Sequence, residues 1–177
     1  MRAIACLLSL IAAALSLYVF GRKSEVRHAA PAMAYQKAKA DALFESSFKQ
    51  FSSTKIALAQ FKGSPLIVYF WASWCVECRN EAKALMVLQQ QHRSSQLAVI
   101  GIGVDQSDSL HRFTRDTELT YPVFVAGRDG IELSRRMGNL LGEMPFVAVI
   151  DRHGILVAKH FGKFAPQTLD AMAAALQ

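Results

Sequence analysis

The stretch LIVYFWASWCVECRN, residues 66–80, joins an apolar run to a closely spaced pair of cysteines. Residues 66–71 are all apolar, and most of them are β-branched or aromatic, a pattern typical of a strand buried on both faces of a sheet. Cys75 and Cys78 follow a few positions later with two residues between them. The stretch therefore predicts a buried strand that leads directly into a Cys-x-x-Cys site.

The sequence on the C-terminal side of this stretch predicts alternating helices and strands. A helix is expected from Val76 to about His92, where apolar residues recur at helical spacing. Further strands are predicted over residues 97–104, 121–125, 146–150 and 155–160, and further helices over 108–119, 131–137 and 166–176. Residues 127–130 are expected to form a turn, and residues 151–154 (DRHG) a hairpin turn. This order predicts an α/β fold with a central mixed β-sheet flanked by helices on both faces.

Residues 1–40 differ in composition from the rest of the chain. An uninterrupted apolar run of 18 residues, Ala3 to Phe20, follows Arg2, and this length just suffices to span a bilayer. The best small-x-small cleavage motif, Ala32-Met33-Ala34, lies about fourteen residues beyond the run, which is far for a signal peptidase. The sequence predicts a signal anchor or signal peptide over residues 1–21, with the uncleaved anchor favoured, a linker over 22–40 and a folded domain over 41–177.

The charge distribution gives no indication of a nucleic-acid partner. The formal net charge is +6, and residues 1–34 carry four basic side chains and one acidic side chain. The remaining sequence is therefore only weakly basic, with acids and bases mixed throughout, which is typical of a solvated surface. The third cysteine, Cys6, lies inside the N-terminal apolar run and is interpreted as a small apolar residue of a membrane helix.

The position of the cysteine pair indicates redox chemistry. Cys75 is expected between the end of a buried strand and the start of a helix, where the positive end of the helix dipole favours a thiolate. Cys78 is expected on the same face of the first helical turn, so that the two sulfurs are able to form a disulfide. In this arrangement Cys75 would attack a partner's disulfide and Cys78 would resolve the mixed disulfide.

Other uses of a Cys-x-x-Cys pair fit the sequence less well. A zinc site needs two further ligands at suitable spacing, whereas His92 and His111 are isolated. Covalent haem attachment needs a histidine directly after the second cysteine, and Arg79 stands there. A purely structural disulfide over so short a loop would restrain little of the unfolded chain. No cofactor and no resident metal are therefore expected, although a copper chaperone that uses the dithiol as a soft metal site stays an alternative.

Two longer stretches carry a resemblance to a known family. FKGSPLIVYFWASWCVECRNEA (residues 61–82), followed by GNLLGEMPFVAVIDRHGILVAKHFG (residues 138–162), resembles the membrane-anchored, exported thioredoxin-like proteins of the TlpA/ResA/cytochrome c-maturation group. The similarity runs from about Ala42 to the C-terminus. It implies a thioredoxin fold over residues 41–177, with the strand–helix insertion typical of this group near Asp105 and Tyr121. The Thr-x-x-Cys context of a peroxiredoxin's peroxidatic cysteine does not occur in the sequence.

The resemblance also implies roles for individual residues. Cys75 corresponds to the nucleophile and Cys78 to the resolving thiol. Met144 and Pro145 match the family's cis-proline dipeptide, which lies beside the disulfide and binds the substrate's backbone. Trp74 is expected to shield the disulfide and to offer a flat contact surface to the substrate.

Three acidic or aromatic positions distinguish this chain within the resemblance. Glu77 stands where many members have proline, and its negative charge opposes a thiolate. Tyr69 stands where ordinary thioredoxins carry a buried aspartate. Glu81 matches the acid of ResA-like proteins and, three residues after Cys78, is expected to take or relay its proton. The alternative for Glu81 is a first-turn acid that stabilises the helix dipole.

Together these features predict an exported thiol–disulfide oxidoreductase. We expect it on the periplasmic side of a bacterial inner membrane, attached through residues 1–21, or soluble in the periplasm if that segment is cleaved. It would reduce disulfides of partner proteins during apocytochrome c or copper-protein maturation, and a membrane electron donor would keep its own dithiol reduced. The alternatives are a disulfide oxidase or isomerase of the same fold, and the redox-silent copper chaperone.

Overall fold

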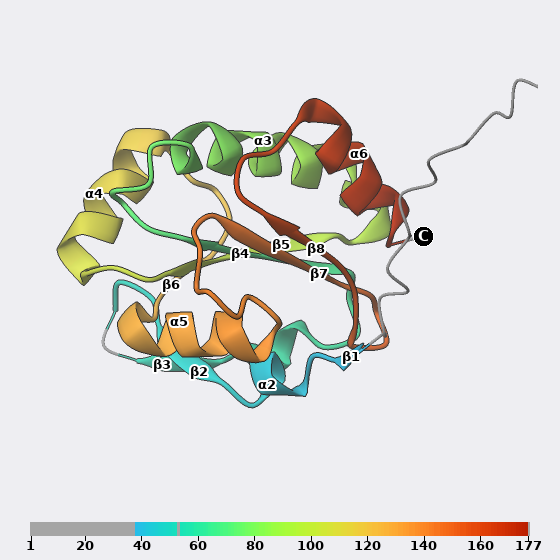
Figure 1. Ribbon diagram of the computed structural model, residues 1–177, viewed down its shortest axis with the longest axis horizontal. Helices are drawn as coiled ribbons and strands as arrows, with labels where there is room; N and C mark the ends of the chain where they lie inside the picture. Colours follow the sequence, from blue (N-terminus) through green and yellow to red (C-terminus); the bar gives the residue numbers. More distant parts are fainter. Residues whose placement is uncertain (1–37, 53, 177) are drawn as a thin grey trace, which may run out of the picture. The chain divides into compact units, whose positions relative to one another are not determined.

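A mixed sheet of eight strands lies between two layers of helices in the computed structural model (Figure 1), which describes residues 38–52 and 54–176. The strands are β1 (Ala38–Lys39), β2 (Ser47–Lys49), β3 (Lys55–Ala57), β4 (Leu66–Trp71), β5 (Ala98–Gly103), β6 (Val123–Val125), β7 (Phe146–Ile150) and β8 (Ile155–Phe161). The helices are α2 (Asp41–Phe44), α3 (Cys78–Gln91), α4 (Ser107–Thr117), α5 (Gly127–Arg136) and α6 (Pro166–Ala174), with short 3-10 helices at Leu58–Phe61 and Arg93–Ser95.

The predicted signal anchor or signal peptide over residues 1–21 lies outside the described residues, as does most of the 22–40 linker. Within the described part of the chain, no helix is both long and apolar enough to cross a membrane.

The strands follow the order β1-β8-β7-β4-β5-β6-β2-β3 across the sheet. The central strand β4 runs parallel to β5 and antiparallel to β7, so the sheet is mixed, as predicted. From β4 to α6 the strands and helices also succeed one another in the predicted order. The thioredoxin-type α/β architecture expected from the sequence is confirmed.

Strand β4 supplies side chains to both hydrophobic cores, because alternate residues of a strand point to opposite faces. Ile67, Tyr69 and Trp71 belong to the core beneath α3, α4 and α6. Leu66, Val68 and Phe70 belong to the core that α2 and α5 cover on the other face. All six side chains are buried, which explains why this strand reads as an unbroken apolar run.

Two local predictions were wrong. The helix expected from Val76 begins at Cys78, because the preceding residues form a turn instead. Gly127 to Gly130 form the first turn of α5 and not a connecting loop. A Cβ atom at Gly130 would lie 2.8 Å from the Cβ of Ala126 and 3.0 Å from Val104, so this glycine permits close packing between α5 and the sheet.

The β7–β8 hairpin brings the ends of three strands together. Its predicted turn is held by Asp151, whose Oδ1 accepts hydrogen bonds from the backbone N–H groups of His153 and Ile155, each at 2.9 Å. Phe146 at the start of β7 pairs with Phe161 at the end of β8 and with Phe70 near the end of β4. The carboxyl end of β4, from which the cysteine loop departs, therefore lies beside the start of β7 and the end of β8.

Candidate active site

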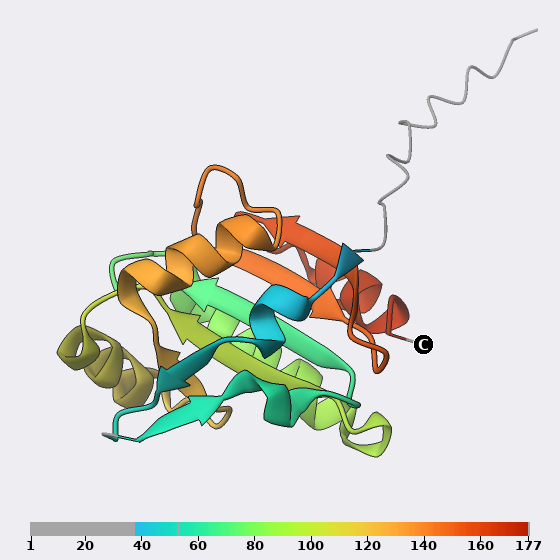
Figure 2. The same ribbon diagram turned by 90° about the horizontal axis from the view of Figure 1, so that it is seen from below.

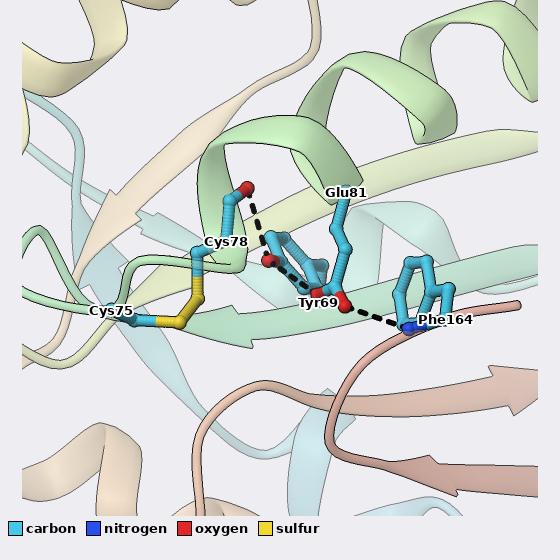
Figure 3. The surroundings of a disulfide bond; sticks show 5 residues. All are labelled: Tyr69, Cys75, Cys78, Glu81 and Phe164. Atoms are coloured by element: carbon cyan, nitrogen blue, oxygen red, sulfur yellow. Dashed lines mark hydrogen bonds between the residues drawn. A yellow bond between two sulfur atoms is a disulfide. The ribbon is translucent and has the colours of Figure 1, made fainter.

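A disulfide joins Cys75 and Cys78 just beyond the end of β4 (Figure 3), with 5.4 Å between the two Cα atoms. The backbone N–H of Cys75 donates to the carbonyl of Ala72 at 3.2 Å, which closes a turn before the helix. Cys78 is the first residue of α3. The helix thus begins at the second cysteine, and the disulfide holds Cys75 against its first turn.

The two cysteines differ in their exposure to solvent. Cys75 is 6% exposed and Cys78 is fully buried. The neighbouring side chains of Trp74 and Val76 are 67% and 83% exposed. Both cysteines are therefore buried next to two exposed apolar side chains, and of the two only Cys75 keeps any exposed surface.

A side-chain contact that the sequence analysis missed holds the loop before Cys75. The hydroxyl of Ser73 donates to the carboxylate of Asp105, the residue that follows Val104 at the end of β5. The N–H of Val104 also donates to the carbonyl of Trp71 at 2.9 Å. The sequence does contain a signal for this contact, because Asp105 follows the buried strand predicted over residues 97–104. That strand runs parallel to β4, and the carboxyl ends of parallel strands meet at one edge of the sheet.

Glu81 lies one turn after Cys78 on α3, and its carboxylate is buried. Its Oε1 accepts a hydrogen bond of 2.8 Å from the backbone N–H of Phe164, and its Oε2 accepts one of 3.1 Å from the hydroxyl of Tyr69. The same hydroxyl lies 3.3 Å from the carbonyl oxygen of Cys78. In the disulfide form, Glu81 is thus connected to Cys78 through Tyr69 (Figure 3).

The Tyr69 hydroxyl carries a single hydrogen, so it donates to one of these two acceptors at a time. An ionised Glu81 accepts that hydrogen. A protonated Glu81 instead donates to the tyrosine oxygen, and the Tyr69 hydrogen is then available to the carbonyl of Cys78. The direction of the hydrogen bonds between α3 and β4 therefore depends on the protonation state of Glu81.

Burial raises the pKa of Glu81 above its ordinary value of 4.5, because the ionised form loses its hydration. The hydrogen bonds from Phe164 and Tyr69 and the nearby His160 oppose this effect, and the negative charge of Glu77 adds to it. Burial and the neighbouring Glu81 also raise the pKa of Tyr69, so its hydroxyl stays protonated. The result is a buried carboxyl group that binds a proton more tightly than an exposed one.

We expect the free energy of unfolding of the oxidised protein to depend on pH through the protonation of Glu81. The folded-state pKa of Glu81 lies above the unfolded value, so its contribution to the free energy of unfolding is complete below about pH 4.5 and is lost as the pH rises through the folded pKa. Denaturant unfolding of the wild type and of Glu81→Gln over this range measures the effect as a difference. The wild type should lose more stability than the variant as the pH rises, and equal slopes would contradict the prediction.

A cavity of about 390 Å³ opens beside the disulfide. Its lining includes Val76 and Glu77 from the turn before α3, Glu81 from α3, Lys163 and Phe164 from the segment between β8 and α6, and Leu169 from α6. Because Glu81 lies on its wall, this cavity connects the buried carboxylate to solvent. A proton taken up by Glu81 thus has a route out of the protein.

The bond between Met144 and Pro145 is cis, as the resemblance implies. Since Phe70 pairs with Phe146, the dipeptide lies next to the end of β4 and the cysteine loop. The carbonyl of Pro145 accepts a 2.9 Å hydrogen bond from the N–H of Gly162, which follows β8. The structure therefore brings this dipeptide to the same end of the sheet as the disulfide.

Metal ligands do not cluster near the disulfide. Across residues 38–52 and 54–176, no group of three or more histidine, cysteine, aspartate or glutamate side chains is placed to hold a metal ion.

Comparisons with known proteins agree with this geometry. Residues 26–159 match the AhpC/TSA family. The chain is 27% identical over 128 residues to the thioredoxin-like protein YneN of Bacillus subtilis, an alignment that covers 70% of this chain and 72% of YneN. It is 25% identical over 117 residues to the thiol-disulfide oxidoreductase ResA of Bacillus thuringiensis, and this alignment covers 66% of the chain and 65% of ResA, slightly less than two thirds of the relative's length.

Solved structures show the same fold. The structure of a thiol:disulfide interchange protein of the thioredoxin family from Chlorobium tepidum superposes with a TM-score of 0.64 and 24% identity, over 73% of this chain and 90% of that protein. This likeness establishes the fold.

Proposed function

The chain belongs to the AhpC/TSA family, and from this premise, its ResA-like relatives and the Cys75–Cys78 pair we propose that it is a thiol–disulfide oxidoreductase that reduces disulfides of partner proteins. The observation that carries the proposal is the disulfide at the start of α3, in which Cys75 keeps 6% of its surface exposed and Cys78 none. The partners would be proteins whose cysteines must be kept reduced, as in apocytochrome c or copper-protein maturation.

The reaction begins from the reduced dithiol. The thiolate of Cys75 attacks one sulfur of the partner's disulfide, a mixed disulfide forms, and the other partner sulfur leaves as a thiolate. Cys78 then loses its proton and attacks the sulfur of Cys75, which releases the second partner thiolate and closes the Cys75–Cys78 disulfide. The partner gains two electrons, and the dithiol loses them.

Glu81 serves in the second step as the acceptor of the Cys78 proton. Its carboxylate lies one turn from Cys78, has a raised pKa, and faces a cavity open to solvent. Tyr69 orients this carboxylate through its hydroxyl and contacts the backbone of Cys78. Transfer takes place directly once the disulfide has opened, or through a water molecule.

The acidic surroundings of the pair favour the reducing direction. Glu77 lies between the two cysteines, and Glu81 follows one turn later. Negative charge destabilises a thiolate, and a reduced form that is less stable relative to the disulfide makes a dithiol a stronger reductant. The positive end of α3 acts in the opposite sense, and the two acids offset it.

The reduction potential of the Cys75–Cys78 couple tests the proposed direction. We expect a value below about −220 mV in equilibrium with dithiothreitol or glutathione buffers. A matched variant, Glu77→Gln, should raise the potential, because it removes one negative charge without changing the shape of the loop. A wild-type value near about −120 mV would overturn the reductase in favour of an oxidase. Tight stoichiometric binding of Cu(I) without reduction of insulin would instead identify a copper chaperone.

A reductant in an oxidising compartment needs a supply of electrons. We propose that residues 1–21 direct the domain to the periplasmic side of a bacterial inner membrane, as an anchor or as a cleaved signal. A membrane protein with its own dithiol would then return the Cys75–Cys78 disulfide to the reduced form. The 18-residue apolar run supports this proposal.

A further inference from the structure

The segment between β8 and α6 contributes to the surroundings of Glu81. Strand β8 ends at Phe161, and residues 162–165 lead into α6, which begins at Pro166. Figure 2, viewed from the side of α2 and α5, shows α6 behind the sheet, on the face that also carries α3. The backbone N–H of Phe164 reaches the Glu81 carboxylate from this segment, so the segment helps to hold the proposed proton acceptor.

His160, in the last part of β8, binds the same peptide group as Glu81. Its Nε2 lies 3.1 Å from the carbonyl oxygen of Lys163, and the N–H of the next residue, Phe164, donates to Oε1 of Glu81 at 2.8 Å. The carbonyl of Lys163 and the N–H of Phe164 are the two ends of one planar peptide group. A continuous series of hydrogen bonds therefore joins the imidazole of His160 to the carboxylate of Glu81.

The carbonyl of Lys163 fixes the direction of these hydrogen bonds. A carbonyl oxygen only accepts, so Nε2 of His160 carries the hydrogen, either in the neutral Nε2–H tautomer or in the imidazolium ion. Donation to the carbonyl polarises the peptide group and makes its N–H a stronger donor. The imidazolium ion has the larger effect, because its hydrogen bond is charge-assisted. His160 thus strengthens the hydrogen bond that stabilises the ionised form of Glu81.

Separate contacts fix the residues on either side of this peptide group. The ring of Phe164 lies edge to face against the imidazole of His160, with 5.4 Å between the ring centroids, and against the ring of Tyr69 at 6.1 Å. The N–H of Gly162 donates to the carbonyl of Pro145 at 2.9 Å. These contacts keep the peptide group between the imidazole and the carboxylate.

Ionisable groups from several elements surround Glu81 and His160. Within the described chain they are Glu77 from the turn before α3, Tyr69 of β4 and Lys163 of the segment after β8. Burial raises the pKa of Glu81 and the charge of Glu77 raises it further, whereas the hydroxyl of Tyr69 and the nearby His160 lower it. Strand β7, which pairs with β8 beside His160, has only apolar side chains. Asp170, the one ionisable residue of α6, does not line the cavity that Glu81 faces.

We propose that His160 is a positioning residue for Glu81, because it binds and polarises the peptide group whose N–H holds the carboxylate that accepts the Cys78 proton. This role rests on the proposed exchange reaction and adds a group that sets how tightly Glu81 binds its proton. Without the imidazole, the N–H of Phe164 becomes a weaker donor. The ionised carboxylate then loses part of its stabilisation, and Glu81 is protonated over a wider range of pH.

The test follows the rate constant for resolution of a mixed disulfide as a function of pH, after rapid mixing of the reduced protein with a disulfide peptide. His160→Phe keeps an aromatic ring against Phe164 but removes the donor. Its rate constant should be about threefold below the wild-type value where the rate still rises with pH, and equal to it at the plateau. His160→Gln keeps an N–H donor and should recover most of this loss. His153→Phe makes the same change in the β7–β8 hairpin, at the other end of β8, and should leave the whole profile unchanged.

A second measurement needs no exchange activity. In the oxidised protein the amide proton of Phe164 donates to Glu81, so its NMR chemical shift follows the ionisation of the carboxylate. The midpoint of this titration should move to higher pH in His160→Phe and should stay close to the wild-type midpoint in His160→Gln.

Three results would overturn this role of His160. Equal pH profiles of the wild type and His160→Phe would show that the imidazole does not act on Glu81. Equal losses in His160→Phe and His160→Gln would exclude the hydrogen bond to the peptide group. A further loss when His160→Phe is added to Glu81→Gln would show that His160 acts by another route. A wild type that resolves no mixed disulfide would overturn the proposed function, while the Phe164 titration would still decide whether His160 acts on Glu81.

Discussion

The Cys78→Ser variant is expected to accumulate in covalent mixed disulfides with its partner proteins. Cys75 attacks the partner's disulfide as before, but the serine hydroxyl cannot displace the partner from the sulfur of Cys75. Because Cys78 is fully buried, no outside thiol replaces it efficiently at that position. Non-reducing electrophoresis of cells that express the variant, followed by mass spectrometry of the bands that vanish on reduction, measures the accumulation and identifies the partners.

Two further variants control this experiment. Cys75→Ser should form no covalent complexes and should show no disulfide reductase activity, since the attacking thiol is gone. The double variant Cys75→Ser/Cys78→Ser should behave in the same way. Complexes of equal yield with Cys75→Ser and with Cys78→Ser would contradict the assignment of nucleophile and resolving thiol.

The Glu81→Gln variant is expected to slow the resolution of the mixed disulfide by about 100-fold near neutral pH, the usual size of a proton-transfer contribution. Glutamine has nearly the same shape and still accepts the hydrogen bond from the Phe164 N–H, but it takes no proton from Cys78. Rapid mixing of the reduced protein with a disulfide peptide separates attack by Cys75 from resolution by Cys78. Only the second rate constant should fall, and a change confined to the first would exclude a role of Glu81 toward Cys78.

Tyr69→Phe provides the matched comparison for Glu81→Gln. The Tyr69 hydroxyl lowers the pKa of Glu81, so its removal should raise that pKa further and leave the carboxylate in place. The rate constant for resolution should then rise with pH as in the wild type, but the rise should occur at higher pH. The maximal rate constant, reached above that pH, should stay nearly unchanged. A profile that matches the wild type would show that the Tyr69 hydroxyl does not lower the pKa of the acceptor of the Cys78 proton.

The elements of the fold were predictable because their signals are local. The apolar run of β4, the helical spacing in α3 and the turn residues after β7 each lie within a short window of sequence. Boundaries were less certain. Gly127 and Gly130 have the composition of a turn, yet they belong to α5. Gly127 has a φ of 51°, and Gly130 permits close packing against Val104, so each position favours glycine for its own reason.

The candidate site was predictable only in part, for the same reason. Cys78 and Glu81 lie within one helical turn of each other, and this spacing, together with the resemblance to ResA-like proteins, suggested a joint role. The position of Trp74 next to Cys75 was equally clear from the sequence. The resemblance implied that its side chain offers a contact surface, and the side chain is 67% exposed.

By itself the sequence determined the order of strands and helices from β4 to α6 and the cysteine pair, since each depends on periodicity or on spacing along the chain, while the resemblance pointed to the acid that follows the pair. The tertiary structure decided which distant groups serve that pair. Glu81 meets Tyr69 across 12 positions and Phe164 across 83, and Ser73 meets Asp105 across 32. It also decided that His160 and Glu81 bind the two ends of one peptide group. Such contacts follow from the order and register of the strands, and these are set by packing of the whole domain that no local stretch of sequence encodes.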